Sequence, residues 1–237
     1  MKAYIKHILS VLLICFAISS CQDNENWRII PYEPEPEVPS SGPAELRIAG
    51  SHQGWKPEAE VIGKLYPVKN SSGEMDGDYA GYVYLGTEFK ICPNASWDGA
   101  FGASENTSEG SLETGDGLGN LKVATEGYYH VTCNIKDLTW SCKAMNWGVI
   151  GDFNGWTEQA SLTYDPADLK LKATIEFPND GGFKFRANDK WEEGNIGGTL
   201  DELVQGGDSP NIPITAGTYQ VVLDLSTPTY TAEVIAQ

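Results

Sequence analysis

The sequence predicts an all-β protein built from two tandem immunoglobulin-like β-sandwiches. Its 237 residues include 26 glycines, 13 prolines, 7 tryptophans, 11 tyrosines and 7 phenylalanines, with few helix-like runs, which favours strands and turns. Alternation at 79–85, 88–91 and 129–135 is typical of strands with one buried face. A duplication of about a hundred residues indicates two domains rather than a solenoid, whose units are typically 20–45 residues.

The duplication divides the chain into a first copy (44–145) and a second copy (146–237). The matched stretches are LRIAGSHQGW (46–55) with WGVIGDFNGW (147–156), EFKICPNASW (88–97) with GFKFRANDKW (182–191), NLKV (120–123) with NIPI (211–214), and 129–144 with 219–234. The residues that recur in order are Trp55 with Trp156, Lys90 with Lys184, Asn94 with Asn188, and Trp97 with Trp191.

The second copy has the clearer strand pattern. We expect strands at 147–150, 169–176, 183–187, 217–224 and 230–235, with a turn at 226–228. In the first copy, the Gly-, Ser- and Asn-rich run 94–120 is expected to be one long loop, and loops of that length are usually functional. The strand count and spacing suit small antiparallel sandwiches.

A candidate binding patch lies in the second copy. If Phe183 and Phe185 face the core, Lys184 and Arg186 between them face outward. These two cations are then expected to converge with three further residues on one exposed patch. Those three are Trp156, Asn188 and Trp191. Flat aromatic rings stack on pyranose faces while Lys, Arg and Asn hydrogen-bond hydroxyls, so the composition indicates a sugar-binding site.

Each of these residues also has a purely structural interpretation. A tryptophan at the end of a strand is often a half-buried support for the core. By default Lys184 and Arg186 are solvated strand charges, and Asn188 is a turn residue. Recurrence of the Trp, Lys, Asn and Trp set favours a site, more strongly in the second copy, although duplication preserves scaffold as well.

The N-terminal residues form two segments outside the sandwiches. Residues 1–21 have Lys2 and Lys6, a short apolar run and a final ISSC (18–21), which resembles the lipobox of bacterial lipoproteins. The resemblance implies that Cys21 becomes the lipidated first residue; the alternative is an ordinary secretory signal. Residues 22–43 contain alternating Pro and Glu, typical of a semi-rigid spacer or a disordered tail. QDNEN (22–26) resembles the tag that directs Bacteroidetes lipoproteins to the outer face of the outer membrane.

Cysteine usage in the first copy leaves two alternatives open. Cys133 and Cys142 flank a predicted hairpin turn with both side chains inward, so they form either a disulfide in an oxidising exterior or two small buried thiols. Cys92 has no evident His partner and is predicted to be neither catalytic nor metal-binding.

Several functional classes are disfavoured. A formal charge of −17 without basic clusters argues against nucleic acid as a partner. The histidines are His7, His52 and His130, and no Ser or Cys lies in a recognisable nucleophile motif. Counting alone does not exclude a glycosidase carboxylate pair, but the acidic residues lie in loops with little enclosing cleft. No acidic spacing matches a calcium loop. We therefore predict no enzyme activity, cofactor or metal.

A family resemblance adds to this interpretation. GDFNGW (151–156), FKFRANDKW (183–191) and NIPI (211–214) together resemble the starch-binding modules of SusE/SusF, outer-membrane lipoproteins of the starch utilisation systems of Bacteroides. They are also similar to the glycogen-binding module of the AMP-activated kinase β-subunit. By position, the resemblance implies α-glucan binding by one set of residues in each copy. The sets are Trp156, Lys184, Trp191 and Asn211, and Trp55, Lys90, Trp97 and Asn120.

The resemblance implies a cell-surface lipoprotein of the outer membrane that binds starch or another α-glucan without cleaving it. Its expected partners are the membrane, through the lipid anchor, and a TonB-dependent transporter with its glycan-binding lipoprotein. The first copy departs from the pattern, with SHQGW for DFNGW and Cys92 where Arg186 stands. The alternatives are a docking lipoprotein of the transporter complex and binding of a different polysaccharide.

Overall fold

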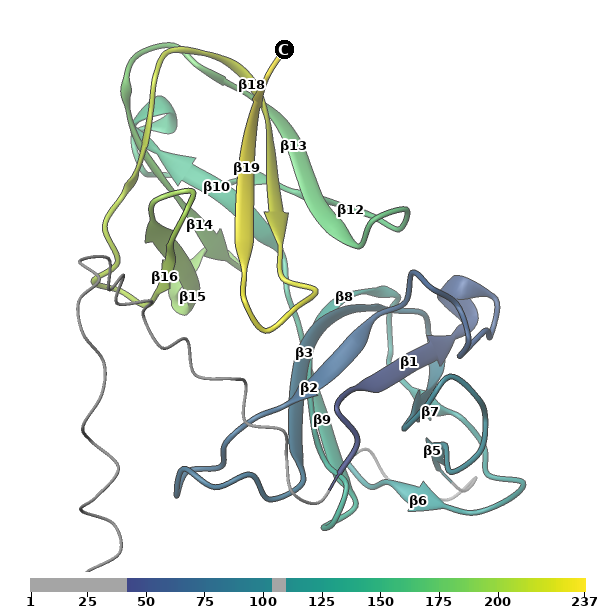
Figure 1. Ribbon diagram of the computed structural model, residues 1–237. Coiled ribbons are helices and arrows are strands. Elements are labelled where there is room, and N and C mark those ends of the chain that lie inside the picture. The colour runs from purple at the N-terminus through teal and green to yellow at the C-terminus, as the bar shows by residue number, and fades with distance from the viewer. Residues whose placement is uncertain (1–41, 104–109) are drawn as a thin grey trace, which may run out of the picture. The chain divides into compact units, whose positions relative to one another are not determined.

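The computed structural model describes residues 42–103 and 110–237. The targeting segment, Cys21 and nearly all of the spacer lie outside these residues, so their roles stay predictions. The regular secondary structure of the described chain consists of strands and two short 3₁₀ turns, joined by loops (Figure 1), and its sheets are β-sandwich-like, which confirms the predicted fold class. No helix within 42–103 and 110–237 has the length and apolar character that crossing a bilayer requires.

The first copy folds into a sheet that bends around one core. Its strands are β1 (Leu46–Gly50), β2 (Lys64–Pro67), β3 (Asp78–Leu85), β4 (Glu88–Cys92), β5 (Phe101–Gly102), β6 (Glu113–Thr114), β7 (Leu121–Lys122), β8 (Gly127–Asn134) and β9 (Thr139–Ala144). The order is β6-β5-β4-β1-β2-β3-β8-β9, with β7 paired to β4. Strand β2 pairs with β1 at one end and β3 at the other, so it connects the two halves.

The second copy has a similar strand order, but its strands form two separate sheets instead of one continuous sheet. Its strands are β10 (Trp147–Gly151), β11 (Ala160–Ser161), β12 (Thr163–Asp165), β13 (Lys170–Phe177), β14 (Gly181–Ala187), β15 (Lys190–Gly198), β16 (Leu203–Gln205), β17 (Ile212–Ile214), β18 (Gly217–Asp224) and β19 (Thr231–Ala236). One sheet runs β11-β10-β14-β15-β16 with β17 on β14, and the other runs β12-β13-β18-β19. The short strands β11 and β12 replace the continuous β2 of the first copy.

Most of the expected strands are present within one or two residues of their predicted bounds. The expected long loop 94–120 is partly wrong, because β5 and β6 form a small antiparallel extension next to β4. These strands have two residues each, too short for an alternating pattern to be visible in the sequence.

Alternation along the central strands separates core from surface. In β14, Phe183 and Phe185 are fully buried in the second core, together with Val221 and Leu223 of β18. In β4, Phe89 and Ile91 occupy the matching positions of the first core. The side chains between them point to the opposite face, which carries the candidate site.

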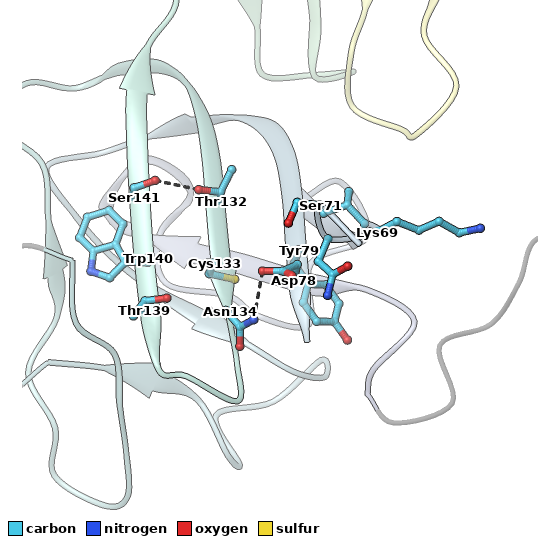
Figure 2. Close-up of a pocket in the computed structure, with 12 residues that line it drawn as sticks. Lys69, Ser71, Asp78, Tyr79, Thr132, Cys133, Asn134, Thr139, Trp140 and Ser141 are labelled. Carbon is cyan, nitrogen blue, oxygen red and sulfur yellow. Dashed lines mark hydrogen bonds between the residues drawn. The ribbon is translucent and has the colours of Figure 1, made fainter. Parts of the chain in front are cut away.

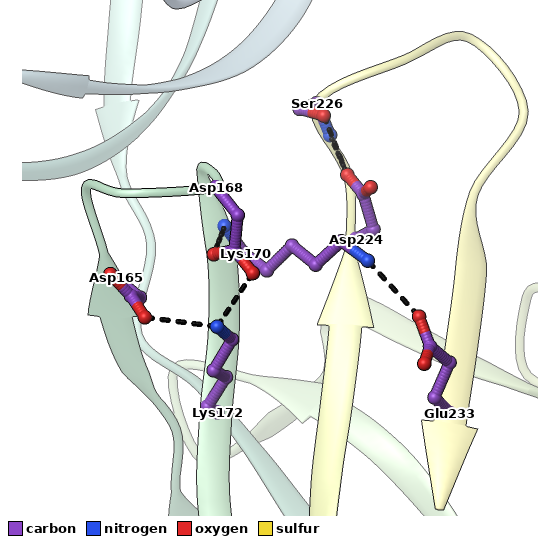
Figure 3. A network of polar contacts seen from close by, with 7 residues as sticks. All are labelled: Asp165, Asp168, Lys170, Lys172, Asp224, Ser226 and Glu233. Atoms are coloured by element: carbon purple, nitrogen blue, oxygen red, sulfur yellow. Dashed lines mark hydrogen bonds and ion pairs between the residues drawn. The ribbon is translucent and has the colours of Figure 1, made fainter. Parts of the chain in front are cut away.

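The outer face of the four-stranded sheet is covered by ion pairs (Figure 3). Lys172 bridges Asp165 and Asp168, at Nζ to Oδ2 distances of 2.9 and 2.6 Å, and Lys170 pairs with Glu233 at 3.0 Å. Exposed pairs of this kind contribute little to stability, about 0–1 kcal/mol each. This face is a solvated surface whose polar groups already have partners.

The Cys133 and Cys142 pair does not form a disulfide in the structure. Cys133 lies opposite Trp140 in the ladder between β8 and β9, and Cys142 lies opposite Val131. The two residues are therefore diagonal rather than directly paired, and Cys133 is a free thiol. Burial raises the pKa of Cys133 to about 12 and that of Cys92 to about 11, which makes both thiols poor nucleophiles.

Replacing Phe185 with Ala should destabilise the protein by about 3–5 kcal/mol, because it removes a fully buried ring from the second core. Val204→Ala, at an exposed position, is the matched control and should change stability by less than about 0.5 kcal/mol. Urea unfolding followed by tryptophan fluorescence measures both variants. Equal stabilities would contradict the assignment of Phe185 to the core.

Candidate functional site

The first aromatic residue of each copy is presented by an unusual turn. A 3₁₀ turn follows each first strand: η1 (Ser51–Gln53) precedes Gly54 and Trp55, and η2 (Asp152–Asn154) precedes Gly155 and Trp156. Trp55 and Trp156 have φ of 61° and 59°, in the left-handed region that bulky side chains rarely adopt. Such strain costs on the order of 1–3 kcal/mol and is concentrated at functional sites.

A second tryptophan completes an aromatic pair in each copy. Trp97 lies in the loop after β4, and Trp191 lies in β15, just after the hairpin turn at Asn188 and Asp189. The ring centroids of Trp55 and Trp97 are 6.3 Å apart at 42°, and those of Trp156 and Trp191 are 6.2 Å apart at 33°. Trp97 is 44% exposed and Trp191 is 41% exposed. Both copies therefore present a tilted aromatic pair to solvent.

A lysine lies on the outward face of the central strand in both copies. Lys90 Nζ donates a hydrogen bond to the carbonyl oxygen of Leu118 at 2.6 Å, and Lys184 Nζ donates to that of Gly207 at 3.4 Å. Each acceptor belongs to the loop that leads to a predicted asparagine. The lysine thus ties that loop to the central strand, and the ammonium groups retain further donors.

The asparagines of the two copies differ in their surroundings. Asn120 Nδ2 donates to Glu88 Oε2 at 3.2 Å, and Glu88 also pairs with Lys122. Asn211 is exposed beside Gly182, which stands where the first copy has Glu88. Asn211 therefore has no carboxylate neighbour at this position.

In the first copy the structure brings the predicted set together. A cavity of about 340 Å³ is lined by eight residues. They are Trp55, Lys90, Trp97, Ala100, Gly115, Asp116, Gly117 and Asn120. All four residues predicted for this copy are among them, whereas Asn94 hydrogen-bonds within its own loop.

The expectation that Lys184 and Arg186 are exposed is wrong. Lys184 is 8% exposed and Arg186 is 4% exposed. Arg186 Nε donates to Gln159 Oε1 at 3.3 Å, its Nη2 donates to Asp189 Oδ1 at 3.1 Å, and its Cζ lies 5.1 Å from the Trp191 ring centroid. Arg186 therefore supports the Trp191 ring by a cation–π contact.

Asn188 is used by the fold rather than presented to solvent. Its Nδ2 donates to the Ala144 carbonyl at 3.0 Å and to Glu193 Oε2 at 2.7 Å, and its Oδ1 accepts from the Asn146 backbone at 2.6 Å. With φ of 53°, it forms the left-handed turn before Trp191. Its geometry favours the alternative interpretation, a turn residue that holds the segment joining the two copies.

The sequence interpretation missed the residue that orients Trp156. Asp152 Oδ1 accepts a hydrogen bond from Trp156 Nε1 at 2.8 Å, and its Oδ2 accepts from the Gly182 backbone at 2.7 Å. The bond from Trp156, followed by the one from Gly182, lowers the pKa of Asp152. Ser51 stands at this position in the first copy, so Trp55 lacks the equivalent carboxylate. The only signal in the sequence was the Asp of the GDFNGW turn.

A cavity of about 510 Å³ lies elsewhere in the first copy, over β3, β8 and β9 (Figure 2). Its polar groups are largely paired with one another: Thr132 Oγ1 and Ser141 Oγ are 2.7 Å apart, and Asn134 Nδ2 donates to Asp78 Oδ1 at 3.0 Å. The tryptophans of both candidate sites lie outside its lining. This cavity therefore lacks the aromatic platform of the candidate sites.

Comparison with known proteins identifies the second copy. Residues 146–231 match the family model described as SusF/SusE starch specific CBMs. The second copy is therefore similar to the SusF/SusE modules. Among solved structures, the crystal structure of SusF from Bacteroides thetaiotaomicron is 24% identical with a TM-score of 0.41, covering 81% of this chain. The present chain covers 48% of that one. No curated protein matches the chain.

The range matched by the family model, 146–231, contains Trp156, Lys184, Arg186, Trp191 and Asn211. The first copy lies outside this range. The equivalence of the first site therefore depends on the internal duplication. In residues 42–103 and 110–237, no group of three or more His, Cys, Asp or Glu side chains is arranged to hold a metal ion. The two tryptophan pairs are thus the candidate functional sites.

The free energy of unfolding should decrease at low pH because the Glu193 carboxylate becomes protonated. Hydrogen bonds from Asn188, Lys190 and Lys143 lower the pKa of this carboxyl from 4.5 to about 2. The depressed pKa means that its stabilising contribution is full above pH 4.5 and is lost as the pH falls towards 2. Glu193→Gln should flatten this part of the pH profile in urea unfolding, whereas Glu192→Gln should leave it unchanged. Parallel profiles for wild type and Glu193→Gln would contradict the assignment.

Proposed function

We propose that this protein binds starch-like α-glucan at the two tryptophan pairs without cleaving it. The observation that carries the proposal is the recurrence of one tilted, half-exposed tryptophan pair in both copies, with Lys90 in the same cavity as the first pair. The family matched by the second copy is described as starch-specific, which supports the same ligand class.

In this proposal the rings of each pair stack on consecutive glucose units. Because the rings are inclined by 42° and 33°, they suit a chain that curves, as α-1,4-linked glucose does, better than a flat ribbon. Lys90 and Asn120, or Lys184 and Asn211, hydrogen-bond the hydroxyl groups. Aromatic contacts contribute about 0.5–1.5 kcal/mol beyond burial, so each site alone is weak.

Two weak sites on one chain suit a polymeric ligand. Once one site has bound, the second binds intramolecularly, which can raise the apparent affinity for a polysaccharide by about a hundredfold without a new contact. Together with a lipidated Cys21 and a Pro/Glu-rich spacer, this arrangement would capture glucan at the outer surface of the outer membrane. A TonB-dependent transporter and its glycan-binding lipoprotein are the proposed partners in uptake.

Native gel migration in the presence of amylopectin tests the binding. The gel should retard the wild type, and Trp156→Ala/Trp191→Ala should relieve much of the retardation because it removes the second platform. Trp55→Ala/Trp97→Ala measures the contribution of the first platform. Val204→Ala, at an exposed position in β16, is the control. Free migration of the wild type would reject the starch proposal and favour a docking role or another glycan.

The proposed anchor has its own test. Cys21→Ser in the full chain should shift the protein from the membrane fraction to the soluble fraction, because the acyl chains have no attachment point. Cys92→Ser, which changes a buried thiol in the first copy, is the control and should remain membrane-bound. Membrane retention of the Cys21 variant would show that another element attaches the protein.

A further inference from the structure

The first candidate site contains a carboxylate that the proposed mechanism does not use. Asp116 lines the first cavity together with Trp55, Trp97 and Lys90. It lies between Gly115 and Gly117, whose φ values of 135° and 75° are suited to glycine. The loop therefore adopts a backbone that places a single acidic residue at the cavity wall.

The carboxylate of Asp116 is available to a ligand. None of the described residues forms a hydrogen bond or an ion pair with it. Lys90, in the same cavity, is instead hydrogen-bonded to the backbone of Leu118, two residues further along the loop. The cavity thus offers an acceptor from Asp116 and donors from Lys90 beside two aromatic faces.

The second copy lacks this acceptor. Counting back four residues from Asn120 and from Asn211 places Gly207 at the position of Asp116. Lys184 donates to the carbonyl of Gly207 and Lys90 to that of Leu118, two positions later in this count, so the loop contacts the lysine in both copies at different positions. Asp208 is the next residue of the second copy, at the position that Gly117 occupies in the first copy. Replacing Asp208 therefore controls for the loss of a loop carboxylate that lies outside the first cavity.

We propose that Asp116 contacts the ligand and makes the first site selective for neutral sugar chains. This inference rests on the proposed glycan binding. The carboxylate accepts charge-assisted hydrogen bonds from two neighbouring hydroxyl groups of one glucose unit. An anionic sugar would bring a second negative charge next to Asp116, which disfavours binding. The second site, without a carboxylate at this position, discriminates less.

Calorimetry with the full chain in detergent micelles tests the loss of the carboxylate. In a Trp156→Ala/Trp191→Ala background only the first site remains, and the probes are maltoheptaose and maltoheptaose oxidised to carboxylate at C6. Asp116→Asn should weaken binding of the neutral probe about tenfold. It should also reduce the preference for the neutral over the oxidised probe. Asp208→Asn in this background should change neither affinity.

Adding a carboxylate to the second site tests whether the same selectivity can be introduced there. In a Trp55→Ala/Trp97→Ala background, Gly207→Asp should strengthen maltoheptaose binding and weaken binding of the oxidised probe. The fold should tolerate it, since a Cβ at Gly207 meets no atom within 4 Å. If the parent proteins bind neither probe, the proposed function fails. If they bind and Asp116→Asn leaves both affinities unchanged, glycan binding stands and the role of Asp116 is overturned.

Discussion

Both candidate sites depend on the alternation of one central strand in each copy. Phe183 and Phe185 are fixed by the second core, and the strand geometry then directs Lys184 and Arg186 to the opposite face. The same strand pairs with β10, which leads into the turn that carries Trp156. Core packing therefore sets the position of the lysine relative to the aromatic pair, and the binding face needs no separate scaffold.

The two copies hold their aromatic platforms with different degrees of support. In the second copy, Asp152 fixes the Trp156 indole and Arg186 lies against Trp191. In the first copy, Ser51 and Cys92 occupy these positions, and Ser51 Oγ donates instead to the Glu88 carbonyl at 3.3 Å. A ring that is already held loses less conformational entropy on binding. The second site is therefore better preorganised, while the first has the more varied set of polar groups.

The sequence was sufficient for features that recur or alternate. The tryptophan pairs, the lysines and most strands were predicted because duplication and the two-residue period expose them directly. The burial of Arg186 was not predictable, because it depends on Gln159 and Asp189, which the fold brings to it through the strand register and the hairpin turn. Likewise, Asn188 gave no sign that it holds Ala144 and Asn146, more than forty residues earlier. Diagonal placement of Cys133 and Cys142 follows from a ladder register that alternation alone does not fix.

The net negative charge of the chain affects which ligands can approach either site. The formal charge of the chain is −17, so it repels anionic polymers. At physiological salt this repulsion extends over a screening length of about 8–10 Å, which is longer than a hydrogen bond or ion pair. A neutral glucan is not repelled, so charge does not oppose the proposed stacking and hydrogen bonds. Lys90 and Lys184 donate to backbone carbonyls rather than to carboxylates, so neither lysine is held in an ion pair at these contacts. The long-range charge of the protein and the local donors therefore favour the same class of ligand, an uncharged polyhydroxylated chain.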